Sequence, residues 1–264
     1  MIVIGGGPAG SCAATLLARA GRTVRVLERE RFPRFHVGES LLPYNASIFD
    51  ELGVTATLRE AGFPIKRGAQ FHLGNGSKGT GFVFASGKFT RHTEAFQVER
   101  ARFDEILLRH AARCGAQVEE GVEVERVEAD AEGVSVRMKD GTVHRGRMVI
   151  DASGRGNLTG SQEGLRVMNP KLKKLAVFGH YEGVQVDPGT QGGDTVIIRQ
   201  EDHWFWLISL RLDGDGTGKV SVGAIVERDD FSRAGQTAEA FLDGRIQSSP
   251  PVRDRLAKAR RVSP

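Results

Sequence analysis

The sequence contains few cysteines, and this limits the chemistry it can support. Its 264 residues include only two, Cys12 and Cys114. They lie far apart, in segments with a helical pattern, and have no metal-ligand spacing. We therefore expect two small buried side chains and no metal site.

Long hydrophobic runs are also missing. No apolar stretch approaches the roughly 20 residues that a membrane-spanning helix needs. The apolar start at Ile2 lacks the basic region and cleavage site of a secretory signal. We therefore expect a cytoplasmic protein without a membrane partner. With 39% hydrophobic and 27% charged residues, the composition is that of a globular protein, and the length allows one large or two smaller domains.

The chain carries only a small net positive charge. The net charge is +4 and the pI is about 9.3, which could suggest a nucleic-acid partner. However, lysine and arginine are dispersed among acids, and the short basic clusters at 29–34 and 171–174 are more typical of solvated loops. We therefore expect no nucleic-acid partner. A non-catalytic flavin- or nucleic-acid-binding protein remains the alternative from another functional class.

Glycine is abundant, with 34 residues, and one cluster has a recognisable pattern. The apolar residues 2–4 run into Gly5–Gly10, an Ala/Leu-rich segment follows over 11–20, and a second apolar run over 23–27 ends at Glu28. This order predicts a strand, a tight turn, a helix, a second strand and an acid. It is the pattern of a dinucleotide-binding fold.

Each residue of the turn has a physical role. Gly5 permits the turn, Gly7 lets the backbone approach a pyrophosphate, and Gly10 lets the helix pack on the strand. The start of the helix offers free N–H groups to phosphates. An acid at Glu28 can accept hydrogen bonds from an adenosine ribose, which favours FAD or NAD over NADP. The predicted cofactor-binding residues here are Gly5, Gly7, Pro8, Ala9, Gly10 and Glu28.

Periodicity and turn residues predict the remaining elements. We expect helices over 42–53, 55–61, 102–113 and 237–259, the last interrupted by Pro250-Pro251. Residues 68–73 and 81–84 predict a hairpin with its turn at 74–77, residues 95–98 a strand, and residues 118–150 an up-and-down sheet. From residue 175 onward we expect antiparallel strands over 176–181, 195–199, 204–210 and 219–226.

A polar loop follows the strand predicted at 148–150. It begins with Asp151 and contains Gly154, and ligands of open α/β sheets bind at the carboxyl ends of strands. On its own, Asp151 would be read first as a strand-end cap.

With these pieces in order, the chain resembles the FAD-dependent monooxygenase superfamily with its hydroxylase-type fold. The resemblance rests on the glycine turn with Glu28, on residues 98–104 and on the Asp151–Gly154 loop. It implies FAD as cofactor, Arg100 near the flavin phosphates, and Asp151 and Gly154 in a flavin loop. It also implies an α/β fold with a Rossmann-like FAD-binding domain, over 1–64 and 91–165, and an antiparallel β-sheet substrate domain, over 65–90 and 166–264.

Two narrower signals resemble the flavin-dependent halogenases. Residues 32–43, which include Gly38, Glu39 and Ser40, match the loop that leads to the flavin ring in these enzymes, which implies that these three residues bind cofactor. Residues 204–208 resemble the family's W-x-W-x-I-P signature, but Ser209 stands in place of the proline. Strand alternation alone would place Trp204 and Trp206 on one face, as ordinary core or cavity wall.

Lys66 is the predicted catalytic residue. It precedes Gly68-Ala69 in a segment similar to the one whose lysine guides or carries the electrophilic halogen in halogenases of the phenol and pyrrole type. A lysine amine can donate a hydrogen bond when charged or form a haloamine when neutral, and burial can lower its pKa. The alternative is a solvated lysine at the start of a strand.

The family's second flavin signature, a Gly-Asp followed by Ala, has no match, because Gly193-Asp194 and Gly214-Asp215 lie in predicted turns without the alanine. We therefore expect the chain to be incomplete at its C-terminus. The resemblance implies a halogenase that uses FAD, halide, a separate flavin reductase and a small aromatic substrate, either free or carrier-bound. The alternative is an FAD-dependent monooxygenase or an isoprenoid-type reductase on the same fold.

Overall fold

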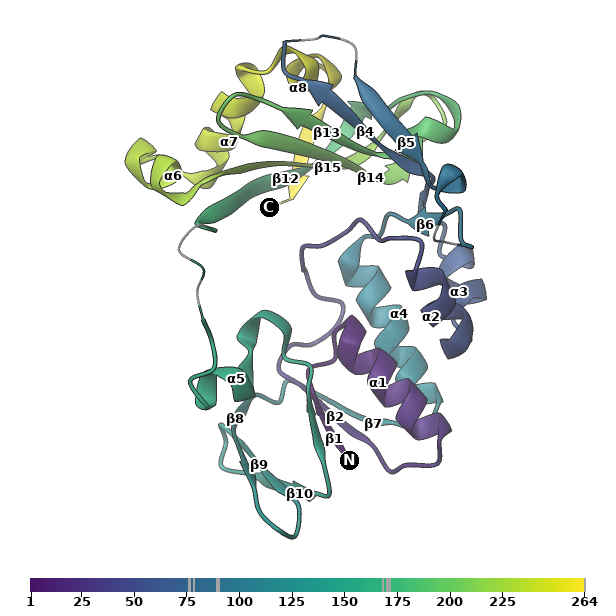
Figure 1. Cartoon of the computed structure of the whole chain (residues 1–264), viewed down its shortest axis with the longest axis vertical. Coiled ribbons are helices and arrows are strands. Elements are labelled where there is room, and N and C mark those ends of the chain that lie inside the picture. Colours follow the sequence, from purple (N-terminus) through teal and green to yellow (C-terminus); the bar gives the residue numbers. More distant parts are fainter. Residues whose placement is uncertain (76, 78, 89–90, 168, 170–171, 264) are drawn as a thin grey trace. The chain divides into compact units, whose positions relative to one another are not determined.

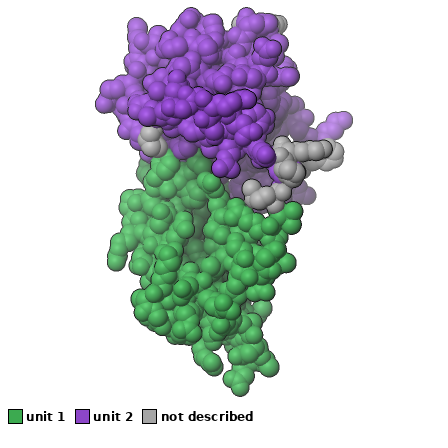
Figure 2. Space-filling view, turned by 90° about the vertical axis from the view of Figure 1, so that its left-hand side faces the viewer, with its two compact units in different colours: residues 1–37, 49–61, 100–168 green, residues 38–48, 62–99, 169–264 purple. Residues whose placement is uncertain are grey.

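The computed structural model describes residues 1–75, 77, 79–88, 91–167, 169 and 172–263 (Figure 1). The chain forms two compact units, coloured separately in Figure 2. Unit 1 comprises residues 1–37, 49–61 and 100–168, and unit 2 comprises 38–48, 62–99 and 169–264. Segments 38–48, 62–64 and 91–99, which we expected with the FAD-binding domain, thus belong to the second unit.

Unit 1 is built on a four-stranded parallel sheet. Its strands are β1 (Ile2–Ile4), β2 (Arg25–Glu28), β7 (Gln117–Glu120) and β11 (Val149–Asp151), in the order β11-β1-β2-β7. The helices α1 (Pro8–Arg19) and α4 (Arg100–Arg113) lie side by side on the sheet (Figure 1). Their apolar faces and the strands share a core that includes Val3, Ala14, Val26, Leu108 and Ala111.

The prediction of an up-and-down sheet over 118–150 is wrong at both ends. β7 and β11 belong to the parallel sheet, and only β8 (Val124–Ala129), β9 (Val134–Met138) and β10 (Val143–Gly146) form an antiparallel sheet. Alternating apolar residues indicate a strand but not its partner, which explains the error. Unit 1 also contains α3 (Thr55–Glu60), the 3₁₀ turn η2 (Gly154–Gly156) and α5 (Leu158–Gln162), while α2 (Asn45–Leu52) spans residues of both units.

Unit 2 is built on a seven-stranded sheet in the order β16-β12-β15-β14-β13-β4-β5. The strands are β4 (Gly68–Leu73), β5 (Thr80–Val83), β12 (Lys174–Gln185), β13 (Thr195–Arg199), β14 (Trp204–Leu212), β15 (Thr217–Glu227) and β16 (Arg260–Ser263). Neighbours are antiparallel except β13 and β4. The short strands β3 (Ile65–Lys66) and β6 (Ala95–Phe96) pair separately, and the 3₁₀ turns η1 (Phe84–Ser86) and η3 (Gly189–Gly193) complete the unit. The expected fold class, a parallel α/β part with a largely antiparallel sheet, is confirmed.

Helices cover one face of this sheet. The core between them contains Phe205, Leu207 and Val222 from the strands and Leu242 and Val252 from the helices. The helix predicted over 237–259 is two helices, α7 (Ala238–Gln247) and α8 (Pro250–Arg255), because proline starts a helix well but cannot continue one. The sequence reading missed α6 (Arg228–Ala234). The β4–β5 hairpin is present, but residue 76 of its predicted turn lies outside the described residues.

Candidate cofactor cleft and lysine site

Two glycines of the first turn are required by the fold of unit 1. Gly5 has φ +98°, a conformation that side chains disfavour, and a Cβ there would lie 2.5 Å from Ala152 O. A Cβ on Gly10 would lie 1.9 Å from Gly5 O. Gly10 therefore allows α1 to pack against the turn, as the sequence predicts.

Gly7 differs because it faces open space. It is the N-cap of α1, in extended conformation, with no side-chain cap and no acid in the first turn. A Cβ there would meet only Arg34 Nη2, at 3.4 Å. The start of α1 thus offers free amides and positive dipole charge, which suits a phosphate.

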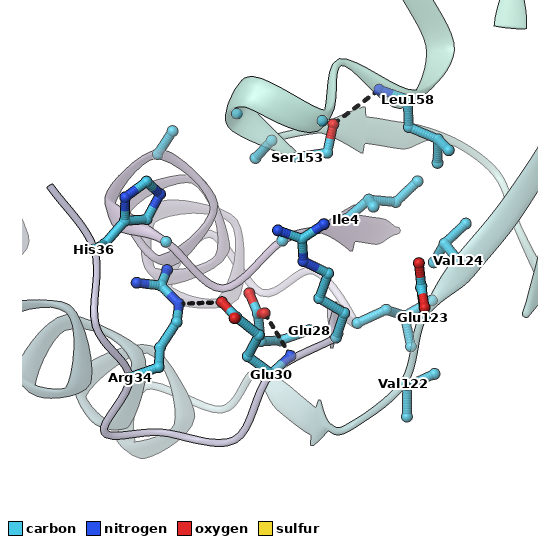
Figure 3. Close-up of a pocket in the computed structure, with 18 of the residues that line it drawn as sticks. Ile4, Glu28, Glu30, Arg34, His36, Val122, Glu123, Val124, Ser153 and Leu158 are labelled. Carbon is cyan, nitrogen blue, oxygen red and sulfur yellow. Dashed lines mark hydrogen bonds and ion pairs between the residues drawn. The ribbon is translucent and has the colours of Figure 1, made fainter. Parts of the chain in front are cut away.

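A cleft of about 370 Å³ opens at this turn (Figure 3). Seven of the predicted cofactor residues line it, namely Gly5, Gly7, Pro8, Ala9, Glu28, Arg100 and Gly154. Gly10 and Asp151 are not among its lining residues. Gly38, Glu39 and Ser40 belong to unit 2.

Glu28 is buried at the edge of the cleft, and backbone amides donate hydrogen bonds to both oxygens of its carboxylate. Its Oε2 accepts a hydrogen bond from Gly6 N at 2.6 Å. Its Oε1 accepts one from Glu30 N at 2.8 Å, which Figure 3 shows. Each carboxylate oxygen has a further lone pair. The predicted contact of Glu28 with a ribose therefore remains compatible with this geometry and stays a prediction.

Arg34 is a cleft residue that the sequence reading missed. Its Nη1 donates to Asp104 Oδ2 at 2.9 Å, and Arg100 Nε donates to Asp104 Oδ1 at 2.7 Å. Asp104 is fully buried. One carboxylate thus orients two guanidinium groups, and Arg34 Nη2 faces Gly7 with no partner among the described residues. The only signal in the sequence was the basic cluster at 29–34.

His36 lines the same cleft, although the sequence offered no role for it. Burial lowers the pKa of His36, and the nearby Arg100 and Arg34 lower it further. The imidazole therefore favours its neutral form there.

Asp151 acts as a local cap. Its Oδ1 accepts from Ser153 N at 2.9 Å, and its Oδ2 accepts from Thr159 N at 2.8 Å. Burial opposes ionisation, but the hydrogen bonds from Ser153 and Thr159 outweigh it and lower the pKa of Asp151. The arrangement matches the strand-end cap that the sequence left open, and the cofactor role of Asp151 stays a prediction.

Lys66 lies in the interior of unit 2, so the alternative of a solvated lysine is wrong. The residue is 5% exposed, and its Nζ donates to Ser40 Oγ at 2.8 Å and to Leu41 O at 3.2 Å. The Nζ also lies 5.4 Å from the centroid of the Phe84 ring. Burial lowers the pKa of Lys66 to about 8, opposed by the charge of Asp194. The amine can therefore exchange between charged and neutral forms close to neutral pH.

A second buried polar pair lies beside Ser40 in the sequence. Glu39 is 2% exposed, and its Oε1 lies 2.7 Å from His180 Nε2 on β12. In this structure the Glu39 carboxylate thus contacts a histidine of its own unit. The predicted cofactor contacts of Gly38, Glu39 and Ser40 stay predictions.

The sheet face opposite the helices carries the two tryptophans. Trp204 and Trp206 have ring centroids 6.3 Å apart, and Trp206 packs in a core cluster with Ile208 and Leu210. Trp204, Phe71, Ile197 and other residues line a cavity of about 760 Å³. The two indoles share one face, as alternation predicts, with Trp206 in the core and Trp204 at the cavity wall. Ser209, in place of the family's proline, donates from Oγ to Gly192 O at 2.7 Å.

Comparison with known proteins identifies the class. Residues 1–202 match the family described as FAD binding domain. The match covers more than half of the chain, so the protein belongs to this family and its cofactor is FAD. The free helix start, the open Gly7 and the paired arginines of the cleft fit the phosphates of FAD.

The relatives it resembles are halogenases. The chain is 32% identical to a Pseudomonas fluorescens chlorinase named for 1H-pyrrole-2-carbonyl on a peptidyl carrier protein, and 34% identical to a tryptophan 2-halogenase of Chondromyces crocatus. All of this chain matches in both cases, but it spans only 64% and 50% of those proteins. The solved structure of the myxobacterial chondrochloren halogenase CndH is similar with a TM-score of 0.87 and 39% identity, covering 99% of this chain and 60% of that one.

The described residues show neither a membrane-spanning helix nor a metal site. None of their helices combines the length and hydropathy needed to cross a membrane. No group of three or more His, Cys, Asp or Glu among them could hold a metal ion.

Proposed function

We propose that the protein is a flavin-dependent halogenase that uses reduced FAD, oxygen and halide to halogenate an electron-rich aromatic substrate. The observation that carries this proposal is the buried Lys66, held at Ser40 with a lowered pKa, in a chain whose relatives are halogenases.

Lys66 has the properties that the chemistry needs. When bound, reduced FAD would react with oxygen, and this reaction would convert halide into hypohalous acid. As an ammonium, Lys66 Nζ donates a hydrogen bond to the oxygen of hypohalous acid and polarises its bond to the halogen. As a neutral amine, its nitrogen can take the halogen from hypohalous acid to form a haloamine, while the O–halogen bond breaks and the hydroxyl leaves with an amine proton as water. With a pKa of about 8, both forms are present near neutral pH.

The substrate cavity fits an aromatic ring. Strand β13 connects it to the lysine: Thr195, at one end, contacts Ser40, and Ile197 and Arg199 line the cavity. These three side chains share one face, because alternate residues of a strand point the same way. The rise along the strand from Thr195 to Ile197, where the cavity lining begins, is roughly 7 Å. The proposed substrate site thus begins near the Lys66–Ser40 pair and extends along the sheet face that Trp204 helps to form.

The partners follow from the same proposal. The resemblance to halogenases implies that a separate reductase supplies reduced flavin. Halide is a co-substrate. The aromatic substrate is either free, as the tryptophan halogenase relative suggests, or attached to a carrier protein, as the name of the pyrrole chlorinase indicates.

The test is product formation by the purified protein. The FAD-loaded protein is supplied with chemically reduced flavin, oxygen, bromide and a panel of phenols, indoles and pyrroles, and products are measured by mass spectrometry. We expect brominated product that disappears when bromide is omitted. Hydroxylated product that needs no halide, or rapid NADPH oxidation by the protein alone, would replace the proposal with a monooxygenase.

A further inference from the structure

Three segments that are distant in sequence hold the backbone around Lys66. β3 pairs with β6, which places Lys66 opposite Ala95. Ser40 forms an isolated antiparallel bridge with Gln97, and Leu41 N donates to Phe96 O at 3.1 Å. The backbones of Ser40 and Lys66 are therefore both fixed by the 95–97 segment.

A chain of side-chain hydrogen bonds begins at the lysine. Lys66 Nζ lies 2.8 Å from Ser40 Oγ, and Ser40 Oγ lies 2.9 Å from Thr195 Oγ1. Gln97 Nε2 lies 3.0 Å from Thr195 Oγ1 and 3.1 Å from Gly193 O. Gln97 is fully buried, so these bonds are protected from water.

At the Gln97 end of this hydrogen-bond network, the direction from donor to acceptor is fixed. The Gly193 carbonyl can only accept, so the amide nitrogen of Gln97 must face it. The same nitrogen then donates to Thr195 Oγ1, which keeps its own proton free to donate. Ser40, in the middle, is a hydroxyl that can both donate and accept.

We propose that Ser40 is the positioning residue of Lys66, and that the Ser40–Thr195 hydroxyl pair lets the amine change protonation state without losing its partner. When Lys66 is an ammonium, it donates to Ser40 Oγ, and Ser40 donates to Thr195. When Lys66 is a neutral amine, Ser40 donates to its lone pair and accepts from Thr195. Both states keep the Lys66–Ser40 and Ser40–Thr195 hydrogen bonds by rotating two hydroxyls, with no movement of heavy atoms.

No charged group of a neighbouring element takes the place of Ser40 as the hydrogen-bond partner of Lys66 Nζ among the described residues. Asp194 is the nearby charge that favours the ammonium. Two neighbouring polar pairs are Glu39 with His180 at 2.7 Å and Arg67 with Glu94 at 2.7 Å. Neither pair is bonded to Lys66 Nζ, which donates to Ser40 Oγ and Leu41 O.

This inference explains how the proposed halogenase holds its lysine, but its test needs no halogenation. Protein labelled with ¹³C-lysine is titrated, and the Cε resonance of Lys66 is assigned by its loss in Lys66→Arg. We expect a midpoint of about 8 in the wild-type protein. Ser40→Ala should lower it by roughly one unit, because the ammonium loses a hydrogen bond that is stronger than the one lost by the neutral amine.

Two further variants separate positioning from general damage. Thr195→Val removes the partner that receives the Ser40 proton, so the midpoint should fall less than in Ser40→Ala, and Thr195→Ser should restore it. Ser209→Ala is the matched control, because this buried serine bonds Gly192 O and should leave the midpoint unchanged. An unchanged or raised midpoint in Ser40→Ala would overturn the proposal. A Lys66 midpoint in Thr195→Val equal to that of wild type would overturn the role of the Ser40–Thr195 hydroxyl pair. Either result would leave the halogenase proposal to its own test of product formation.

Discussion

The carboxylate of Glu39 and the imidazole of His180 meet in the interior of unit 2, with Glu39 Oε1 2.7 Å from His180 Nε2. His180 is 3% exposed. Because a carboxylate can only accept, His180 Nε2 carries the proton of this bond. His180 Nδ1 lies 3.0 Å from Ser263 Oγ. The pair thus ties the loop that carries Ser40 to strand β12.

Replacing Glu39 by glutamine should destabilise unit 2. The amide keeps the size of the side chain but weakens the charge-assisted bond to His180, so we expect the free energy of unfolding to fall by about 1 to 3 kcal/mol. Urea denaturation measures it, with Glu60→Gln as an exposed control. Equal stability of Glu39→Gln and wild type would show that the buried pair contributes nothing.

Gly7 and Gly10 should respond differently to substitution. Gly7→Val should fold normally but lose FAD, because a Cβ at Gly7 meets only the end of Arg34 while its side chain occupies the phosphate position. Gly10→Ala should lower the melting temperature, because its Cβ would lie 1.9 Å from Gly5 O. Flavin absorbance and circular dichroism give the two readouts. A Gly7→Val protein that is yellow with a normal flavin spectrum would contradict the account of this turn.

Arg34 should contribute to FAD affinity. Arg34→Gln removes the donor that faces Gly7, and we expect the dissociation constant of FAD to rise roughly tenfold to a hundredfold, the value of one charge-assisted hydrogen bond. Arg34→Lys should lose less affinity for FAD than Arg34→Gln, since the positive charge remains. Fluorescence titration at low and high salt measures both, with exposed Arg22→Gln as the control. The inference about Arg34 fails if Arg34→Gln binds FAD as tightly as Arg22→Gln does.

The buried Lys66 should make stability depend on pH. Its pKa is about 8 in the folded state and 10.5 in the unfolded state, so between these values the unfolded chain binds more protons and stability rises with pH. The stability cost of burying the ammonium is complete below pH 8 and lost above 10.5. The free energy of unfolding of Lys66→Met, relative to that of wild type, should therefore be higher at pH 7 than at pH 10.5, by up to about 3 kcal/mol. Urea denaturation at both pH values tests it, and a pH-independent difference would contradict the lowered pKa.

Local patterns in the sequence predicted much of the fold. β13 lies at the predicted bounds, and α1 and β2 lie within three residues of the predicted ranges 11–20 and 23–27, because local periodicity and turn residues mark these elements. Strand partners were harder to predict. The parallel pairing of β13 with β4, and the joining of β7 to β2, depend on contacts between distant segments that alternation does not encode.

The same limit applies to the site. The sequence singled out Lys66, Arg100 and Gly7 because each stands in a motif. It did not indicate Arg34, whose role depends on Asp104, 70 positions away, or Thr195, which contacts Ser40 from 155 positions away. Such pairs become visible only when packing brings their segments together.

The central claim is that Lys66 positions the halogenating species, and product formation by Lys66 variants tests it most directly. FAD-loaded wild type, Lys66→Ala, Lys66→Arg and the exposed control Lys139→Ala are compared with reduced flavin, bromide and the aromatic panel, with products measured by mass spectrometry and FAD content by absorbance. We expect all four to bind FAD, while product falls roughly a hundredfold to ten-thousandfold in Lys66→Ala, the usual contribution of a positioned proton donor. Lys66→Arg should fail too, because a guanidinium is larger and cannot become a neutral amine. Wild-type product yield from Lys66→Ala would contradict the account.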